Sequence, residues 1–540
     1  MTAAVLPLLE FTPPTIDYVR LLPFLIVMAA ACLGVLVEAF VRRAWRHEVQ
    51  VGLALVALVC ALAVIVTGWG SDALGLADPI GPDQLVGSVM VDGPTQVFWL
   101  MLVLFALLSV CLMAERRVYA GRNAFAPMAA AIPGSRAEAE ADQAGLEHAE
   151  VFPLTLFSLS GMMLFVAADD LLLMFVGLEI LSLPLYVLAA LARHRRLVSQ
   201  EAALKYFLLG AAASAIFLFG AALLFAYAGS FDFDLIALRY DHGAAADRLL
   251  WAGLGLILVG LLFKISAVPF HSWAPDTYQG APTPVTAFMA VCTKIAAVAA
   301  LLRLLFVALG AARWTWQPII AGLAVLTMLV GPLLGAVQHN VKRLLAYSSV
   351  AHAGFLLTGL AGALTLQSGL TEGQFGAVSA ISFYLVAYGL ATIACFAAVT
   401  LVQSGGREAT ELAAWSGLGR RHPWFGLVML VSLLSLAGIP LTAGFVGKFA
   451  IFTTAWRGGY WWLALAGVLF SLVAAYVYVR LLVTLFFRPS DDQVELRLPG
   501  PATAVVLTLT VIGSLAFGLV PGPLADLLGQ ASVFLRSVHG

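Results

Sequence analysis

Long apolar segments separated by short polar loops run through most of the chain. About 20 apolar residues are enough for a helix to cross the hydrocarbon core of a bilayer, so each such segment is a candidate membrane span. The pattern predicts an all-α, polytopic membrane protein with about fourteen transmembrane helices. The predicted spans lie near residues 21–41, 51–69, 95–114, 151–168, 170–192, 200–228, 249–270, 283–309, 317–338, 343–365, 376–402, 424–455, 461–487 and 502–520.

Two of the predicted spans are interrupted by proline and glycine. The seventh contains AVPFHSWAP at Ala267–Pro275, and the twelfth contains LAGIPLTAG at Leu436–Gly444. A straight helix from Trp424 to Trp456 would be about 50 Å long, against a hydrocarbon core of about 30 Å. We therefore expect both helices to break, with the freed backbone groups facing protein or water and not lipid.

The two interrupted spans occupy equivalent positions in the chain. Each is the fourth helix of a set of five, helices 4–8 and helices 9–13, and an odd number of spans places the two sets in opposite orientation. Paired broken helices of this kind are typical of inverted-repeat transporters. The sequence predicts three N-terminal helices in 1–114, a cytoplasmic insert in 115–150, one repeat in 151–309, the other in 317–487, and a last helix and tail in 488–540.

The composition fits this fold and excludes other classes of protein. Of 540 residues, 62% are hydrophobic and 11% are charged, which requires lipid as the main solvent. A net charge of -1 gives no reason to expect a nucleic-acid partner. By the positive-inside rule the basic loops are cytoplasmic, which places both termini outside. These loops carry Arg42, Arg43, Arg46, Arg116, Arg117, Arg122, Arg136, Arg193, Arg195, Arg196, Lys342, Arg343, Arg407, Arg420, Arg421, Arg488 and Arg497.

Charged residues also fall inside the predicted spans. Glu179 and Lys294 each lie about 16 Å from the start of their helix, near the middle of the bilayer. Lys264 and Lys448 lie close to the interruptions, and a broken helix shifts such residues toward the interior. Lys205 is less secure, because it could form an ordinary surface pair with the glutamate four residues before it.

An ionised side chain that faces lipid is costly. At about 2.5 to 3.5 kcal/mol each, five such groups would cost on the order of 12 to 17 kcal/mol. We therefore expect them to face one another or a hydrated interior, either as an ion path or as satisfied interhelical pairs without a transport role. His271 and His352 are weaker candidates, since each fits a proton relay as well as a satisfied structural histidine.

Several motifs resemble one known family. KISAVPFHSWAPDTYQGAPTPVTAF at Lys264–Phe288, followed by TKIAAVAALLRLL, is similar to the antiporter-like membrane-arm subunits of NADH:quinone oxidoreductase, respiratory complex I. GLEILSLPLY around Glu179 and LAGIPLTAGFVGKF around Lys448 carry the same resemblance, which extends over roughly residues 95–487. It implies a proton-translocating subunit that works in a hetero-oligomer with other membrane-arm subunits, in the bacterial inner (cytoplasmic) membrane.

The resemblance also assigns roles to the buried charges. Glu179 and Lys205 would form a carboxylate–lysine pair, and Lys264 would be the central proton carrier. Lys294 would bridge two half-channels, and Lys448 would stand at the far end. Burial favours the neutral form of a lysine, whereas a nearby carboxylate favours its ammonium form. A change in the distance between the two groups would therefore move a proton.

The same resemblance places the redox chemistry in other chains. NAD, FMN, iron–sulfur clusters and quinone are expected in partner subunits, and no cofactor or metal is expected in this one. The five cysteines stand singly, and the sequence has no C-x-x-C pair or glycine-rich loop to hold such groups. Two alternatives stay open. A subunit of a multisubunit cation/proton antiporter shares this architecture, and a quinone-binding or catalytic redox subunit is the second alternative, against which stands the lack of cysteine, histidine-pair and glycine-loop motifs.

Overall fold

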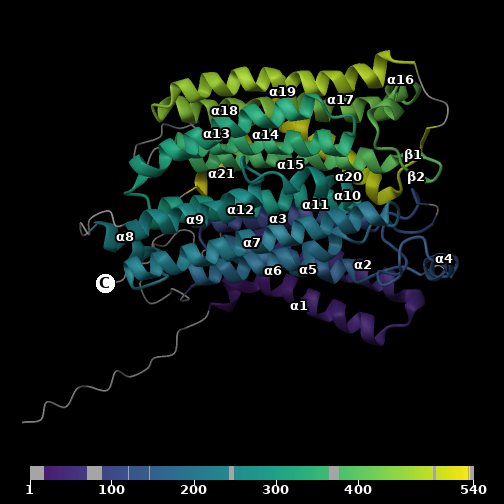
Figure 1. The fold of residues 1–540 in the computed structure, drawn as a ribbon, viewed down its shortest axis with the longest axis horizontal. Coiled ribbons are helices and arrows are strands. Elements are labelled where there is room, and N and C mark those ends of the chain that lie inside the picture. The colour runs from purple at the N-terminus through teal and green to yellow at the C-terminus, as the bar shows by residue number, and fades with distance from the viewer. Residues whose placement is uncertain are drawn as a thin grey trace, which may run out of the picture.

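The computed structural model describes residues 17–69, 88–119, 121–144, 146–241, 248–363, 376–489, 494–532 and 534. Long helices lie side by side and nearly parallel in one bundle (Figure 1). Within the described residues, twelve helical stretches are long and apolar enough to cross a membrane, and Val151–Ala167 and Pro423–Ala437 are shorter apolar helices. Together they match the fourteen predicted spans and confirm the polytopic all-α fold.

The first part of the chain forms the lower half of the bundle in Figure 1. Aspartates begin three of its helices, because their side chains accept hydrogen bonds from backbone N–H groups that have no helical partner: Asp17 caps α1, Asp92 caps α3 and Asp170 caps α6. In chain order the elements are α1 (Tyr18–Phe40), α2 (Arg43–Gly68), α3 (Gly93–Met113), α4 (Arg136–Gln143), α5 (Val151–Ala167), α6 (Leu171–Ala189), α7 (Arg196–Ala228), α8 (Phe233–Asp241), α9 (Arg248–Ile265), α10 (Trp273–Gly280), α11 (Thr283–Phe288), the π-helix η3 (Met289–Thr293), α12 (Lys294–Arg303) and the π-helix η4 (Leu304–Ala308).

The second part of the chain forms the upper half and carries a small antiparallel sheet with the strand order β2-β1-β3. The elements are α13 (Arg313–Ala336), α14 (Val341–Ala361), α15 (Ala377–Leu401), β1 (Val402–Ser404), β2 (Arg407–Glu408), the 3-10 helix η5 (Leu412–Trp415), α16 (Leu418–Arg421), α17 (Pro423–Ala437), α18 (Ala443–Arg457), α19 (Trp461–Phe487), β3 (Glu495–Leu496), α20 (Pro501–Leu519) and α21 (Gly522–Gln530).

Both predicted helix breaks are present. The seventh span ends at Ile265, earlier than the sequence predicted, and continues after a turn as α10. The twelfth span ends at Ala437 because Gly438 adopts a φ of +79°, and it resumes as α18. Helices therefore stop inside the bundle, where their last carbonyls need hydrogen-bond donors. The repeat boundaries, 151–309 and 317–487, stay a prediction that these two breaks support.

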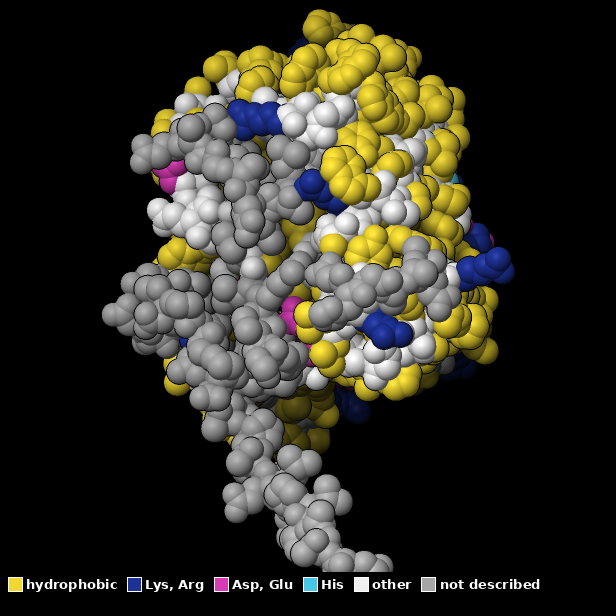
Figure 2. All heavy atoms as spheres, turned by 90° about the vertical axis from the view of Figure 1, so that its left-hand side faces the viewer, with side chains coloured by type: hydrophobic (Ala, Val, Ile, Leu, Met, Phe, Trp, Pro, Cys, Tyr) yellow, Lys and Arg dark blue, Asp and Glu magenta, His cyan; other side chains and the backbone are white. Residues whose placement is uncertain are grey.

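The bundle has a buried centre and an apolar periphery. The stretch Thr283–Ala308, α14 and α15 are almost wholly buried, whereas α1, α2, α19 and α20 expose much of their apolar surface. Figure 2 shows the bundle from the α8 side, with hydrophobic side chains gathered along its top and right-hand edges. These flanks suit lipid or neighbouring membrane proteins. A polar group on the central helices is therefore shielded by a layer of helices.

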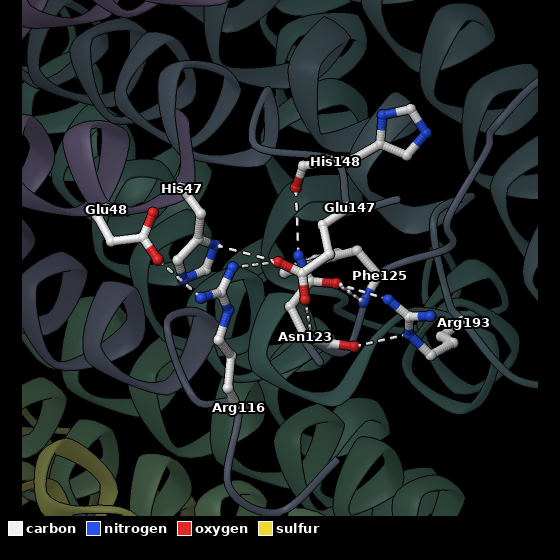
Figure 3. A network of polar contacts seen from close by, with 8 residues as sticks. All are labelled: His47, Glu48, Arg116, Asn123, Phe125, Glu147, His148 and Arg193. Carbon is white, nitrogen blue, oxygen red and sulfur yellow. Dashed lines mark hydrogen bonds and ion pairs between the residues drawn. The ribbon is translucent and has the colours of Figure 1, made fainter. Parts of the chain in front are cut away.

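The insert at residues 115–150 is tied to the helix ends by charged side chains. It contains the short helix α4, and it lies at the same end of the bundle as β1 and β2, which we call the insert end (Figure 1). Figure 3 shows Arg116 reaching both Glu48 and Glu147, while Glu147 also accepts a hydrogen bond from the backbone of Asn123. Arg193 donates to the carbonyl of Asn123 at 2.8 Å. The insert is thus a docked cap on the helix ends.

Candidate functional site

Lys264 lies at the point where α9 stops, enclosed by aromatic rings. Its side chain is 2% exposed, and its Nζ donates to the hydroxyl of Ser182 at 2.7 Å. The same nitrogen lies 5.6 Å from the ring centres of both Tyr186 and Tyr206, a distance at which the ring faces attract a cation. Glu179, one turn before Ser182 on α6, is within electrostatic range of this ammonium group. A proton on Lys264 is therefore sensitive to the position of Glu179.

Glu179 and Lys205 do not form the expected pair. Lys205 is bound instead by Glu201 at 2.8 Å and by Asp276 of α10 at 3.0 Å, and its side chain is 46% exposed. Among the described residues, Oε1 of Glu179 is buried without a hydrogen-bond partner. The i, i+4 spacing of Glu201 and Lys205 on one helix face explains the pairing that formed. Lys205 is thus an ion-paired residue at the flank of the isolated chain.

Lys294 follows a π-helical turn in one of the almost wholly buried helical stretches. The π-helix η3 ends at Thr293, and the extra residue in such a turn changes the direction of the side chains that follow it. Lys294 is 1% exposed, and its Nζ donates to the backbone carbonyl of Ser349 in α14. The ring of Tyr388 lies 5.1 Å from this nitrogen. No described carboxylate lies within 4.0 Å of Lys294, so a charge there has only dipoles and a ring to stabilise it.

Lys448 binds the carbonyl that the second helix break leaves free. Its Nζ donates at 2.8 Å to the carbonyl of Ala437, the last residue of α17, and at 2.7 Å to the hydroxyl of Ser471. The ring of Phe355 lies 4.7 Å from the same nitrogen. The side chain is 4% exposed, so the break places Lys448 in the interior as the sequence predicted.

The two candidate histidines occupy different environments. His352 is buried on α14, with Nδ1 bonded to the hydroxyl of Tyr384 and Nε2 to that of Tyr478 at 3.1 Å. Both Lys294 and Lys448 are within electrostatic range of its ring. His271 is half-buried in the turn after α9, and within the described part of the chain its Nδ1 has no hydrogen-bond partner.

The structure adds Lys342 to this set. The sequence pattern placed Lys342 in a basic loop. In the structure it lies in the first turn of α14, where it is buried and donates to the carbonyl of Ala281 at 2.7 Å. Ala281 directly follows the last residue of α10, and α11 begins two residues later. A signal was available in the sequence: Lys342 and Ser349 are seven residues apart, and so share one helix face.

Sequence reasoning also missed a buried cluster of charged side chains near α8, at the end of the bundle opposite the insert end. Arg303 pairs with Asp92 at 2.7 Å and lies 3.8 Å from Asp169. Burial raises the pKa of Asp169 to about 7, although Arg303 opposes that shift. The sequence did contain a signal for this cluster, an arginine about twenty residues into the eighth predicted span. Its partners could not be predicted, because they come from distant loops.

Buried lysines on discontinuous helices, inside a bundle with an apolar surface, define an ion-translocating membrane protein of the antiporter-like type. No group of three or more His, Cys, Asp or Glu side chains in the described ranges is arranged to hold a metal ion. The expectation that this chain binds no cofactor stays a prediction.

Comparisons with known proteins agree with this class. The family described as NADH:quinone oxidoreductase/Mrp antiporter, TM, matches residues 168–474. NADH-quinone oxidoreductase subunit N of Nocardioides sp. is 51% identical over 98% of this chain and 100% of that protein. The subunit N of Cutibacterium acnes is 49% identical over 99% of both. A chain of respiratory complex I from Thermus thermophilus with bound aureothin has a TM-score of 0.73 and 35% identity, over 94% of this chain and 99% of that one.

The chain therefore belongs to the NADH:quinone oxidoreductase/Mrp antiporter family, and the full-length relatives described above are named subunit N of NADH-quinone oxidoreductase. The family resemblance inferred from the motifs around Glu179, Lys264 and Lys448 is confirmed. The roles of the individual residues are not tested by these likenesses.

Proposed function

We propose that this chain is a proton-translocating membrane subunit of NADH:quinone oxidoreductase, with proton transfer along Glu179, Lys264, Lys294, His352 and Lys448. The observation that carries the proposal is the hydrogen-bonded centre of the bundle. There, His352 lies within electrostatic range of both Lys294 and Lys448 and is bound by two tyrosine hydroxyls. Groups of this kind can exchange protons over short distances without a redox centre.

The transfer from Lys294 to Lys448 follows from the partners of these lysines. Lys294 is held by the Ser349 carbonyl, and the Ser349 hydroxyl accepts a hydrogen bond from Tyr388 at 2.8 Å. His352 stands one turn further along α14 and can take a proton on one ring nitrogen while it releases one from the other. Lys448 then receives the proton at the second helix break, near its exit from the subunit.

Glu179 controls the first step electrostatically. Its charge stabilises the ammonium form of Lys264, so a displacement of Glu179 favours release of the Lys264 proton toward Lys294. Lys205 contacts Asp276 on α10, the part of the seventh span that follows the break, and so joins the flank of the chain to this span. His271, on the same break, is a second position for a relay at this flank.

The chain is proposed to act in a hetero-oligomer with the other membrane-arm subunits. NAD, FMN, iron–sulfur clusters and quinone would be bound by partner subunits, and their redox energy would reach this chain as a conformational signal. The basic loops at the insert end support a cytoplasmic position for that end in the bacterial inner membrane, with both termini outside.

Cation/proton antiport is the alternative function, because the matching family includes Mrp antiporters. The full-length relatives named NADH-quinone oxidoreductase subunit N favour the first function. The two functions differ in what copurifies with the chain and in the ion that is moved.

The test is purification of the affinity-tagged full-length chain from membranes of its host. We expect a large complex that oxidises NADH with quinone, and acidification of inverted membrane vesicles that does not depend on sodium. In the same vesicles Lys294→Ala should abolish proton pumping while the complex still assembles. Sodium-dependent proton exchange by a complex without NADH oxidation would overturn the proposal in favour of antiport.

A further inference from the structure

A small cavity lies at the insert end, beneath the insert and the β1–β2 hairpin. It has a volume of about 40 Å³ and is lined by polar groups. A site of this kind that is polar and offers about 10 to 15 Å³ per molecule holds water, so this cavity has room for two or three waters. The polar lining includes Tyr119, His194, Lys342, Glu408 and Thr410.

Glu408 forms one side of the cavity and links three parts of the chain. It lies on β2, and one carboxylate oxygen accepts a hydrogen bond from Tyr119 of the insert at 2.7 Å. The other accepts from the hydroxyl of Thr283 at 2.6 Å. Thr283 is the first residue of α11, in the helical stretch that leads to Lys294. Glu408 is the only carboxylate among the described residues that line this cavity.

Lys342 also lines the cavity and connects it to the proposed proton path. Its Nζ is bound to the Ala281 carbonyl, where α10 gives way to α11, and Glu408 is within electrostatic range of it. Lys342 is seven residues before Ser349 on α14, a rise of about 10 Å. The Ser349 carbonyl is the acceptor of Lys294. One helix thus carries a buried amine at the cavity and the partner of the central lysine.

A wider groove lies beside the cavity and is open to the surface. It has a volume of about 610 Å³ and runs between α4 and the start of α7. Four residues line both the groove and the cavity: Arg193, His194, Arg195 and Arg407. These four residues therefore form a common wall between the groove and the cavity that holds Glu408.

Two of the other charged groups that line the cavity have hydrogen-bond partners of their own. Arg193 is paired with Asp142 at 2.7 Å, and Arg195 donates to Thr410 at 2.8 Å. Burial, followed by the charges of Arg193 and Arg407, lowers the pKa of His194.

Tyr119 is the remaining titratable side chain that lines the cavity. Burial and then the nearby Glu408 carboxylate raise the pKa of the Tyr119 hydroxyl, and Glu115 adds to that effect. The hydroxyl is therefore a fixed donor to Glu408 at neutral pH. Of the groups around the cavity, Glu408 and Lys342 are left as an acid and a base that line it within electrostatic range of each other.

We propose that this cavity is the proton uptake site of the subunit, in which Glu408 receives a proton from water in the groove and Lys342 passes it toward Lys294. A proton on the Glu408 carboxylate moves through cavity water to the neutral amine of Lys342, and the resulting ammonium releases it along α14. The proposal rests on the proposed function, since it supplies the cytoplasmic end of the same path. The contacts of Glu408 with the insert and with α11 also make the cap part of the uptake site.

The test is Glu408→Gln in the complete complex. Glutamine has nearly the same shape, and its carbonyl oxygen still accepts a hydrogen bond from Tyr119 or Thr283, but it cannot carry a proton. The control is Glu495→Gln on β3 of the same small sheet, where the carboxylate is 68% exposed and pairs with Arg497. Proton pumping and NADH oxidation are measured in inverted vesicles with assembly checked by native electrophoresis.

We expect Glu408→Gln to lower proton pumping by about 10-fold or more, because a positioned proton-transfer group contributes about 100-fold or more. Glu408→Asp should restore part of the rate, and Glu495→Gln should pump as the unaltered complex does. Lys342→Arg, which keeps the charge and the donor to Ala281 but cannot release a proton, should block pumping as well.

Two comparisons separate this proposal from the proposed function. If Lys294→Ala abolishes pumping while Glu408→Gln and Lys342→Arg pump normally, the uptake site is wrong and the proposed function stands. If Lys294→Ala itself pumps normally, the proposed function fails. If Glu408→Gln reduces assembly, Lys342→Arg decides the question, because a purely structural lysine would tolerate arginine.

Discussion

The position of Lys448 can be tested by substitution of a glycine that does not carry a proton. Gly438 lies at the second helix break with a φ of +79°, and a Cβ added there would be 2.6 Å from Cδ of Lys448. Ordinary van der Waals contact begins at 3.4 Å, so Gly438→Ala must displace the lysine by 0.8 Å or move the backbone. The substitution therefore perturbs the geometry of the site while its charges stay the same.

The size of the effect follows from the two hydrogen bonds of Lys448. They measure 2.8 Å to Ala437 and 2.7 Å to Ser471, and a displacement of 0.8 Å along either would lengthen it beyond the normal range. A hydrogen bond to a charged group contributes about 1.5 to 3 kcal/mol. If that energy positions Lys448 for proton transfer, its loss would slow pumping by about 10- to 100-fold.

Gly459 provides a matched control for the backbone. Its φ is +87°, and an added Cβ would meet nothing within 4 Å. Both alanine variants therefore carry a similar left-handed backbone penalty of about 1 to 2 kcal/mol, but only Gly438→Ala reaches Lys448.

The assay is the initial rate of acidification of inverted vesicles, normalised to assembled complex. We expect Gly459→Ala to pump near the unaltered rate and Gly438→Ala to be slowed. Equal rates for the two variants would refute the view that the contacts of Lys448 with Ala437 and Ser471 set the transfer rate.

Three further predictions concern other parts of the site. His352→Gln should lower pumping by about 100-fold, while NADH oxidation in detergent with an artificial acceptor stays unchanged; normal pumping would remove His352 from the path. Glu179→Gln should be as damaging as Glu179→Ala, because the charge and not the volume acts on Lys264; recovery with Gln in the vesicle assay would contradict this. The raised pKa of Asp169, about 7, means that the stability contributed by this group is complete below about pH 4 and is lost as the pH rises through 7. Asp169→Asn should therefore flatten the pH dependence of the thermal dissociation of this subunit between pH 4 and 7, and an unchanged slope would show that Asp169 does not titrate there.

Much of the fold could be predicted because its signals are local. The fourteen spans follow from runs of apolar residues, and the two breaks follow from Pro269, Gly438 and their neighbours. The burial of Lys294 and Lys448 followed from the same reasoning, since a charge far from both helix ends must be enclosed by protein.

The pairings could not be predicted, because they depend on contacts between distant segments. Lys205 binds Asp276, which is 71 residues away and lies on the helix after the break, and this contact requires the bend between α9 and α10. The sequence pattern predicted that Lys342 is a loop residue, but the packing of α14 against the end of α10 buries it. Helix boundaries that shift by a few residues decide such cases, and they are set by tertiary packing.

The partners of the buried lysines explain how these side chains can both hold and release a proton. Lys342 and Lys448 each donate to a backbone carbonyl at a helix break, Ala281 and Ala437, and Lys294 donates to a carbonyl of α14. A carbonyl accepts an N–H from an ammonium and from a neutral amine alike, so it keeps the nitrogen in place whether or not the proton is present.

A carboxylate partner would act differently, because its full charge binds the ammonium form far more strongly than the amine. Lys205, held by Glu201 and Asp276, is of this second kind. Glu179 approaches Lys264 without a direct ion pair, which lets its charge influence the proton without fixing it. The break after Ala437 therefore supplies Lys448 with a neutral acceptor in the membrane interior, a carbonyl at a helix end that needs a donor from outside its helix.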